Sequence, residues 1–223
     1  MTVPSDPTVT VPAMQNFVVR VWLPDRPGAL GQVASRVGAV RGDVVGIEIL
    51  ERGGGSAIDE ITVSLPDASL VELLVAEIRQ VDGVAVEDVR PVAADRPEGA
   101  IAALGAAETI VSAQPGQRLQ AAACALRALL DADWGAVLRL PSGEWLGRCG
   151  DPVAVDWLTA FLNGSEHLPG DGHTGPADLV WARLPRHGAA LACGRTDRVF
   201  HERERTEVQA LARILDALEG GAA

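Results

Sequence analysis

A turn between an apolar strand and an apolar helix has residue types suited to holding a charged small molecule. Its residues are Asp25, Arg26, Pro27, Gly28, Ala29 and Leu30. Gly28 lets the backbone approach a guest closely, and the first amides of the following helix have no partner inside that helix. Those amides, with the positive end of the helix dipole, favour an anionic group. We therefore expect an anion-binding corner at this turn.

Hydrophobic periodicity predicts the elements that position the turn. Apolar residues alternate along residues 17–23, as in a half-buried strand, and recur with helical spacing over residues 30–37. The rest of this half is predicted to hold a helix at 70–78 and strands at 44–50, 58–65 and 84–92. The order βαββαβ predicts a ferredoxin-like α+β fold, with two helices on one face of a four-stranded antiparallel sheet.

The turn and the start of the second strand together resemble an ACT domain, spanning residues 16–93. The residues at that strand are Arg41, Gly42, Asp43 and Val44. The resemblance implies a module that pairs through sheet edges or helices and binds a small effector, commonly an amino acid, at a subunit interface. It also implies two ligand-holding places, the turn and the polar residue that opens the second strand. This residue is Asn in many members and Asp43 here. The implied effector-binding residues are Asp25, Arg26, Pro27, Gly28, Ala29, Leu30, Asp43 and Val44.

An amino-acid effector would need opposite charges a few ångströms apart. The helix terminus would take its carboxylate, and Asp25 and Asp43 would take its ammonium through charge-assisted hydrogen bonds. Both aspartates also have an alternative role. Asp25 could cap the helix, and Asp43 could end a turn.

A polar segment at residues 94–102 interrupts the periodicity and is expected to be a linker. A second α+β domain, at residues 103–219, is predicted beyond it. Its expected order is helix, helix, hairpin, helix, hairpin, helix, at 104–111, 119–129, 134–149, 153–162, 179–195 and 201–218. This order resembles a shortened GAF domain through Leu126, Leu129, Leu130, Asp133, Trp134, Gly135, Ala136, Phe200, Glu204, Val208, Leu211 and Ala212.

Similar domains bind small molecules in a pocket over the sheet, and many only dimerise. Here the strands are few and the loop at residues 163–177 is short, so we expect no roomy pocket. An apolar stripe on the last helix could pair two subunits or cover the domain's own sheet. We expect no metal site, because the one metal-like group lies in a loop rich in Gly and Pro. That group is His167, Asp171, His173 and Asp178.

Charge and composition argue against several classes of partner. The net charge is −11, from 19 basic and 30 acidic residues, which disfavours a nucleic-acid surface. No run of eighteen apolar residues is present, so no membrane span is expected. Residues 1–15 lack the basic start and apolar core of a signal peptide and are expected to be a disordered tail. We expect a cytoplasmic protein.

Catalytic signals are absent from the sequence. Cys124, Cys149 and Cys193 are far apart, lack metal-like spacing and fall in segments predicted to be buried, where cysteine acts as a small hydrophobe. Three hairpin carboxylates, Glu51, Asp59 and Glu60, are expected to be solvated. No phosphate-binding loop or nucleophile elbow is found. We therefore predict no catalytic residues and no cofactor.

These observations predict a non-catalytic regulatory protein, a homodimer that binds an amino-acid-like effector at its ACT interface. Binding would favour one arrangement of the subunits. One alternative is a regulatory subunit that docks onto a catalytic partner protein, an amino-acid biosynthetic enzyme. The other is a purely structural dimerisation protein whose ligand site is dead.

Overall fold

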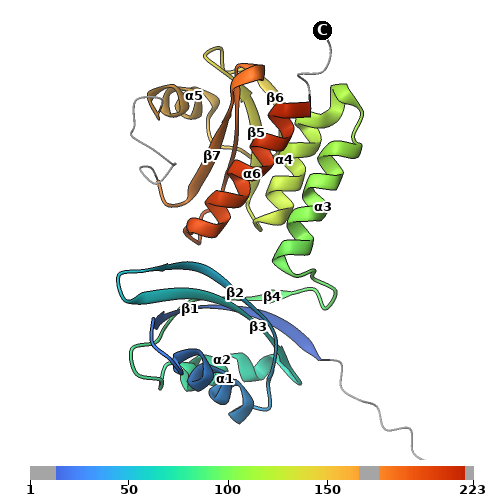
Figure 1. The fold of residues 1–223 in the computed structure, drawn as a ribbon. Coiled ribbons are helices and arrows are strands. Elements are labelled where there is room, and N and C mark those ends of the chain that lie inside the picture. Colours follow the sequence, from blue (N-terminus) through green and yellow to red (C-terminus); the bar gives the residue numbers. More distant parts are fainter. Residues whose placement is uncertain (1–13, 166–175, 219–223) are drawn as a thin grey trace, which may run out of the picture. The chain divides into compact units, whose positions relative to one another are not determined.

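The computed structural model describes residues 14–165 and 176–218. The chain divides after Arg96 into two compact units, each built on a four-stranded antiparallel sheet (Figure 1). Most of the expected tail, and the group of His167, Asp171 and His173, lie outside the described residues. Within the described ranges, no helix has the length and apolarity needed to cross a membrane.

The first unit has the predicted ferredoxin-like order of elements. Its sheet is ordered β2-β3-β1-β4, with antiparallel neighbours. The elements are β1 (Gln15–Pro24), α1 (Ala29–Ala39), β2 (Asp43–Gly53), β3 (Ser56–Leu65), α2 (Val71–Ile78) and β4 (Ala85–Val92), with a 3-10 turn at Ala68–Leu70 before α2.

The core of this unit lies between the sheet and its two helices. The strands contribute every second residue, as their alternation requires. Each helix contributes one face, such as Val33 and Val37 of α1 and Leu74 and Ile78 of α2. Full burial of one such side chain stabilises the fold by about 1.5–3 kcal/mol. The buried strand residues are Phe17, Val19, Val21, Leu23, Ala57, Ile61, Val63 and Leu65.

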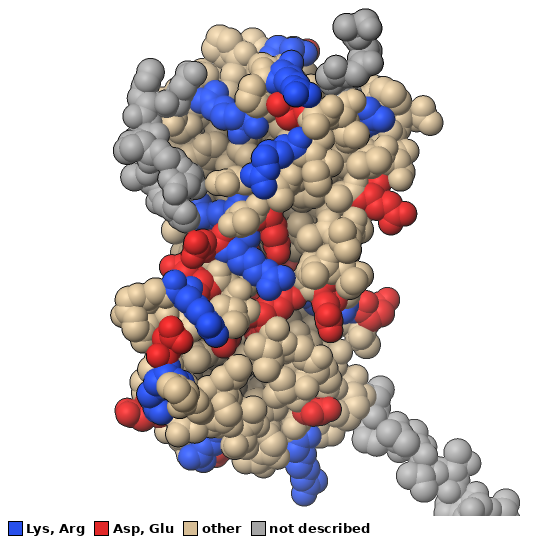
Figure 2. All heavy atoms as spheres, in the orientation of Figure 1, with Lys and Arg blue, Asp and Glu red and all other residues tan. Residues whose placement is uncertain are grey.

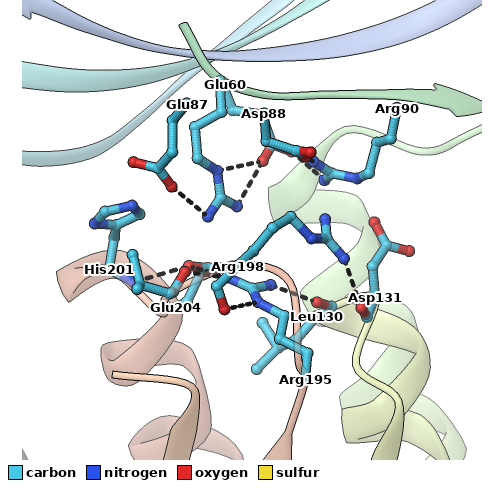
Figure 3. Close-up of polar contacts among 12 residues, drawn as sticks. Glu60, Glu87, Asp88, Arg90, Leu130, Asp131, Arg195, Arg198, His201 and Glu204 are labelled. Atoms are coloured by element: carbon cyan, nitrogen blue, oxygen red, sulfur yellow. Dashed lines mark hydrogen bonds and ion pairs between the residues drawn. The ribbon is translucent and has the colours of Figure 1, made fainter. Parts of the chain in front are cut away.

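An ion cluster centred on Glu60 joins the strands on the sheet face opposite the helices (Figure 3). Glu60 Oε2 accepts hydrogen bonds from Arg20 Nε at 3.2 Å and Arg20 Nη2 at 2.8 Å. Its Oε1 accepts from Arg90 at 3.0 Å and from Arg96 at 3.3 Å. Burial alone raises the pKa of Glu60, but the charges of Arg90 and Arg20 outweigh it and lower the pKa to about 2. The expectation that Glu60 is solvated was wrong, because Glu60 is on a central strand and not at the hairpin tip.

The second unit is also α+β, but its sheet is ordered differently, β6-β5-β8-β7. The first and last strands are central in this sheet, whereas the first and third strands are central in the other unit. Helix α3 already begins at Gly99, inside the segment expected to be a linker. The elements are α3 (Gly99–Ser112), α4 (Arg118–Leu129), β5 (Trp134–Arg139), β6 (Trp145–Gly150), α5 (Val155–Gly164), β7 (Leu179–Leu184), β8 (Ala189–Gly194) and α6 (Glu202–Leu218), with 3-10 turns at Pro115–Gln117 and Pro185–His187.

Helices cover both faces of this second sheet. Helices α3, α4 and α6 pack on one face and α5 packs on the other (Figure 1). The apolar stripe of α6 is buried in the first of these cores, through Val208, Leu211 and Leu215. Of the two roles open for that stripe, the structure therefore supports covering the domain's own sheet.

Arg195 fastens the end of β8 to two helices of the second unit (Figure 3). Its Nη1 donates to the Leu130 carbonyl after α4 at 2.8 Å, and its Nη2 lies 2.8 Å from Glu204 Oε1 in α6. The backbone N–H of His201 donates to Glu204 Oε2 at 2.9 Å. The guanidinium also stacks over the ring of Phe200, 3.9 Å from its centroid. The start of α6 is thereby fixed on the sheet.

Two glycines let α4 lie unusually close to strands β5 and β6. A Cβ added at Gly135 would stand 2.2 Å from the carbonyl oxygen of Ala123, and one added at Gly147 would stand 2.5 Å from that of Leu119. No side chain larger than hydrogen fits at either place without moving the helix. The helix backbone therefore rests directly on the sheet.

We expect replacement of Glu60 by Gln to remove a pH-dependent part of the stability. The carboxylate has a lowered pKa in the folded state, so it stabilises the protein above about pH 4.5, and this contribution disappears as the pH falls to about 2. At pH 7, Glu60→Gln should lower the free energy of unfolding by about 2–3 kcal/mol, and the two proteins should converge near pH 2. Denaturant titrations followed by the NMR signal of the Trp22 indole, the one tryptophan of the first unit, would measure this.

A matched control is Glu72→Gln, at an exposed position in the first turn of α2. Its stability should run parallel to that of the wild type across the same pH range. Parallel curves for Glu60→Gln as well would show that the ion cluster contributes nothing to the pH dependence.

Gly135→Ala tests the close approach of α4. The added methyl overlaps a backbone carbonyl, so the helix must shift, and we expect a loss of about 1–3 kcal/mol or more in the free energy of unfolding. Gly105→Ala in α3 is the control, because its Cβ would meet nothing within 4 Å, and alanine there should stabilise by up to about 1 kcal/mol. Equal effects of the two substitutions in thermal or urea denaturation would contradict the packing described here.

Candidate effector site

The turn between β1 and α1 is tied to the β2–β3 hairpin by its backbone. The N–H of Asp25 donates to the carbonyl of Gly55 at 3.0 Å, and the N–H of Arg26 donates to that of Pro24 at 2.8 Å. Gly28 has a φ of +87°, a conformation that only glycine adopts readily, and stands at the N-cap of α1. The predicted turn therefore has a fixed place at one end of the sheet.

The N-terminus of α1 has its first amide engaged by the turn, because the N–H of Ala29 donates to the carbonyl of Arg26 at 3.3 Å. Within the described residues, no side chain caps this end of the helix by a hydrogen bond, and its first turn holds no acidic residue. Asp25 is thus not the cap, which removes the alternative role considered for it. A Cβ placed on Gly28 would meet nothing within 4 Å, so open space adjoins the amides. An anionic group can approach this helix end.

Asp59 is a buried carboxylate, so the expectation that it is solvated was wrong. It lies opposite Val21 in the β1–β3 ladder and in phase with Ala57 and Ile61, which belong to the core under the helices. Residues directly opposite in a ladder share a face of the sheet, so Asp59 points to the helix side. Only 3% of Asp59 is exposed, and its Oδ1 has no hydrogen-bond partner among the described residues.

The pKa of Asp59 responds to burial and to charges on the hairpin and the turn. Burial raises the pKa of Asp59. The positive charge of Arg52 opposes this shift, and the negative charge of Asp25 adds to it. The charge of Asp25 is therefore close enough to affect the titration of Asp59. An unpartnered buried carboxylate favours an incoming positive charge, because such a charge would restore the interactions lost to water.

The two aspartates expected to share an ammonium do not meet within one chain. Asp43 pairs with Ser64 at the far end of β3, roughly 16 Å along the strand from Asp59. Val44, next to it, packs on the edge of the core. Asp25, Arg26, Pro27 and Gly28 are exposed at the turn, Ala29 is buried and Leu30 is half-buried. The structure thus brings six of the eight predicted residues together and leaves Asp43 and Val44 at the opposite end.

Asp59 could have been found from the sequence by phase. Between residues 57 and 65 the alternation Ala57, Asp59, Ile61, Val63, Leu65 puts one carboxylate in an otherwise apolar series. A charged residue in phase with a buried face is unusual unless it is paired or functional. The nearby glycine turn favours the opposite expectation, a solvated carboxylate in a hairpin.

The arrangement has groups of the two kinds that a zwitterion would need. The open amides of α1 offer a place for a carboxylate, and Asp59 with Asp25 offers negative charge for an ammonium. Among the described residues, no group of three or more His, Cys, Asp or Glu side chains could hold a metal ion.

The second unit has an open pocket of about 780 Å³ beside the edge strand β7, larger than the sequence led us to expect. The C-terminal end of α5 lines it, together with Trp181 and Arg183 of β7 and with Gln209 and Arg213 in the middle of α6. Arg183 also donates to the carbonyl of Leu162 in α5. The pocket is a second place where a small molecule could bind.

On the face shown in Figure 2, arginine side chains are scattered among acidic and uncharged ones and form no continuous basic surface.

Comparisons with known proteins bear on the first unit. The model of the ACT domain family matches residues 17–83. A search of curated protein sequences finds no match to this chain. Similar solved structures include the ACT domain of GTP pyrophosphokinase from Chlorobium tepidum, at 15% identity and a TM-score of 0.30, covering 36% of this chain and 100% of that one.

Two other similar structures extend over more of the chain. One is a protein of unknown function from Galdieria sulphuraria, at 16% identity and a TM-score of 0.33, covering 70% of this chain and 94% of that one. The other is a putative glycine cleavage system transcriptional repressor, at 14% identity and a TM-score of 0.32, covering 91% and 93%. The GAF-like assignment of residues 103–219 stays a prediction.

The βαββαβ order, the glycine turn at the start of α1 and the family match agree over the same stretch of sequence. Residues 17–83 thus match the ACT domain family, whose members are small-molecule regulatory domains.

Proposed function

We propose that this protein is a non-catalytic regulator that binds a free amino acid at its ACT domain. The carboxylate of the effector lies on the amides that open α1, and its ammonium lies on Asp59, with Asp25 adding negative charge. Two observations carry the proposal: the buried Oδ1 of Asp59 has no hydrogen-bond partner among the described residues, and no side chain there caps the N-terminus of α1. A purely structural dimerisation module would have no need of a buried carboxylate in its core.

The ligand chemistry follows from both ends of the site. A helix N-terminus stabilises an anion by about 0.3–1 kcal/mol, and more when the site is partly buried. A hydrogen bond from an ammonium to a carboxylate contributes about 1.5–3 kcal/mol. A ligand with only one of the two charges leaves the other half of the site unused. The site therefore favours α-amino acids over simple amines and simple carboxylic acids.

The proposed homodimer forms through strand β2, which is an edge of its sheet. Val45, Ile47 and Ile49 are exposed apolar residues on this edge, and an unpaired edge strand readily pairs with another chain. Antiparallel pairing of two copies of β2 would bring the start of one strand close to the end of the other. Asp43 of one copy would then approach the β1–α1 turn of the second copy. The resemblance to ACT domains implies that Asp43 acts at this turn.

Regulation follows if the effector binds the paired arrangement better than the unpaired one. A ligand shifts an equilibrium only by its difference in affinity for the two states. A site completed by Asp43 from a second copy has this difference, because the separate chain lacks one acidic group. The effector would thus stabilise one arrangement of the subunits. The second domains would be rearranged together with them.

Asp59→Asn should separate binding from folding. The neutral amide cannot pair with an ammonium, so affinity should fall about 10- to 100-fold for the amino acid that binds the wild type best. The same change removes a buried charge whose pKa is raised, so the unliganded variant should melt at a higher temperature at pH 7. That gain should shrink as the pH falls, since protonation neutralises the wild-type carboxyl too. Isothermal calorimetry and thermal melting with the twenty amino acids would measure both effects.

The matched control is Asp82→Asn, an exposed aspartate after α2, for which neither affinity nor melting temperature should change. No heat with any amino acid in the wild type would contradict the proposed function. Binding that Asp59→Asn leaves intact would keep the function and reject the role of Asp59.

Ile47→Lys should weaken the proposed dimer. It places a charge on the β2 edge, where the Ile47 residue is 43% exposed, and a charge on an edge strand discourages pairing. Sedimentation at equilibrium should show a shift toward monomer for this variant. Leu73→Lys, on α2 and 48% exposed, should leave the dimer intact. The reverse result, a monomer only with Leu73→Lys, would place the interface on the helices.

A further inference from the structure

Two of the three cysteines lie together, contrary to the expectation from the sequence. Cys124 is on α4 and Cys149 is on β6, and both are partly exposed, whereas Cys193 is buried. The expectation that all three are buried and separate was wrong for this pair. Cys193 alone behaves as the expected small hydrophobe, in the core between the sheet and α4.

The close approach of α4 to the sheet produces this contact. Cys149 is the direct cross-strand partner of Gly135, and the carbonyl of Ala123 would stand 2.2 Å from a Cβ on that glycine. Cys124 follows Ala123 on the helix, so its side chain begins at the point where α4 rests on the strands. The two thiols are near enough for each to affect the pKa of the other.

Polar side chains from α4 hold the pair in place. The Nε2 of Gln120 lies 3.3 Å from Cys124 Sγ and donates to the carbonyl of Arg148 at 2.8 Å. Its Oε1 accepts from the N–H of Arg148 at 3.1 Å. Gln120 thereby links α4 to the backbone of β6 at Arg148, the residue before Cys149. The Nη1 of Arg127 lies 3.9 Å from Cys149 Sγ.

The two sulfurs are chemically unequal. Burial raises the pKa of Cys124, and the neighbouring Cys149 thiol adds to the rise. The neighbouring Cys124 thiol, with the positive charge of Arg127, lowers the pKa of Cys149. Burial also raises the pKa of Cys193. Cys149 is therefore the thiol that ionises first, and thiolates are the reactive form.

We propose that Cys124 and Cys149 form a redox-active dithiol, which a hydroperoxide oxidises to a disulfide that joins α4 to β6. The thiolate of Cys149 attacks one oxygen of the O–O bond, which breaks. Cys149 becomes a sulfenic acid, and the other oxygen leaves as an alkoxide or hydroxide that takes up a proton. The thiol of Cys124 then attacks Cys149 Sγ, the S–O bond breaks and water leaves. The peroxide is reduced by two electrons, which the two thiols supply.

The function of this site is independent of the effector site. Small thiols would reverse the oxidation by disulfide exchange, as for other exposed regulatory disulfides. A bond between α4 and β6 would restrict the helix that lies on the glycine-lined surface. The second unit would then have an oxidised and a reduced form.

The test uses the full reduced chain treated with one equivalent of hydrogen peroxide. Peptide mapping by mass spectrometry after alkylation should show an intramolecular Cys124–Cys149 disulfide, with Cys193 still a thiol. Cys124→Ser should instead accumulate a sulfenic acid at Cys149 that dimedone traps. Cys149→Ser should slow peroxide consumption at least tenfold. Arg127→Gln should slow the first step severalfold, because the Cys149 thiolate loses its positive neighbour.

Circular dichroism of each variant checks that it is folded, and the wild-type peptide map stands even if a variant is not. The Cys193→Ala variant is the matched control and should form the disulfide at the wild-type rate. Three unmodified thiols in the wild type, or disulfides only between chains, would overturn the proposal. Equal oxidation of all three cysteines would overturn it as well.

Discussion

The proposed effector site of the first unit depends on one buried carboxylate, that of Asp59. Asp59 occupies a position that the alternation of β3 reserves for the apolar core, and its Oδ1 lacks a hydrogen bond within the described residues. Leaving such a group unpaired costs on the order of 1–3 kcal/mol. Glu60, its neighbour in sequence, faces the other way and is satisfied by Arg20 and Arg90. One pair of adjacent acids thus has one member that stabilises the fold and one that is suited to a ligand.

Helices pack on the sheet in different ways in the two units. In the first, α1 and α2 cover the strands through ordinary apolar side chains such as Val33 and Leu74. In the second, Gly135 and Gly147 remove the side chains beneath α4, so the backbone itself meets the sheet. This closeness brings Cys124 to Cys149 and lets Gln120 reach the backbone of β6. The close packing of α4 on the sheet therefore brings together two thiols whose pKa values shift in opposite directions.

Periodicity predicted most of the elements, because strands and helices each have one buried face here. The ferredoxin-like order of the first unit followed from that pattern, and so did the turn at Gly28. The strand order of the second sheet and the contact of the two thiols did not, since both depend on residues far apart in sequence. The nearness of Asp59 to a hairpin favours a solvated side chain, whereas its phase with Ile61 indicates a buried one, and the structure agrees with the phase. The resemblance to ACT domains combines Asp43 with Asp25, but the structure separates the two residues within one chain.

The central claim is that Asp59 receives the ammonium of an amino acid. Carbon-13 NMR of the Asp59 carboxyl, titrated with pH in the absence and presence of the tightest-binding amino acid, tests it most directly. We expect the unliganded protein to titrate at a raised pKa and the saturated protein to titrate at a lower one, because the bound cation favours the ionised form. An unchanged Asp59 titration, with a shift only at Asp25, would contradict the account.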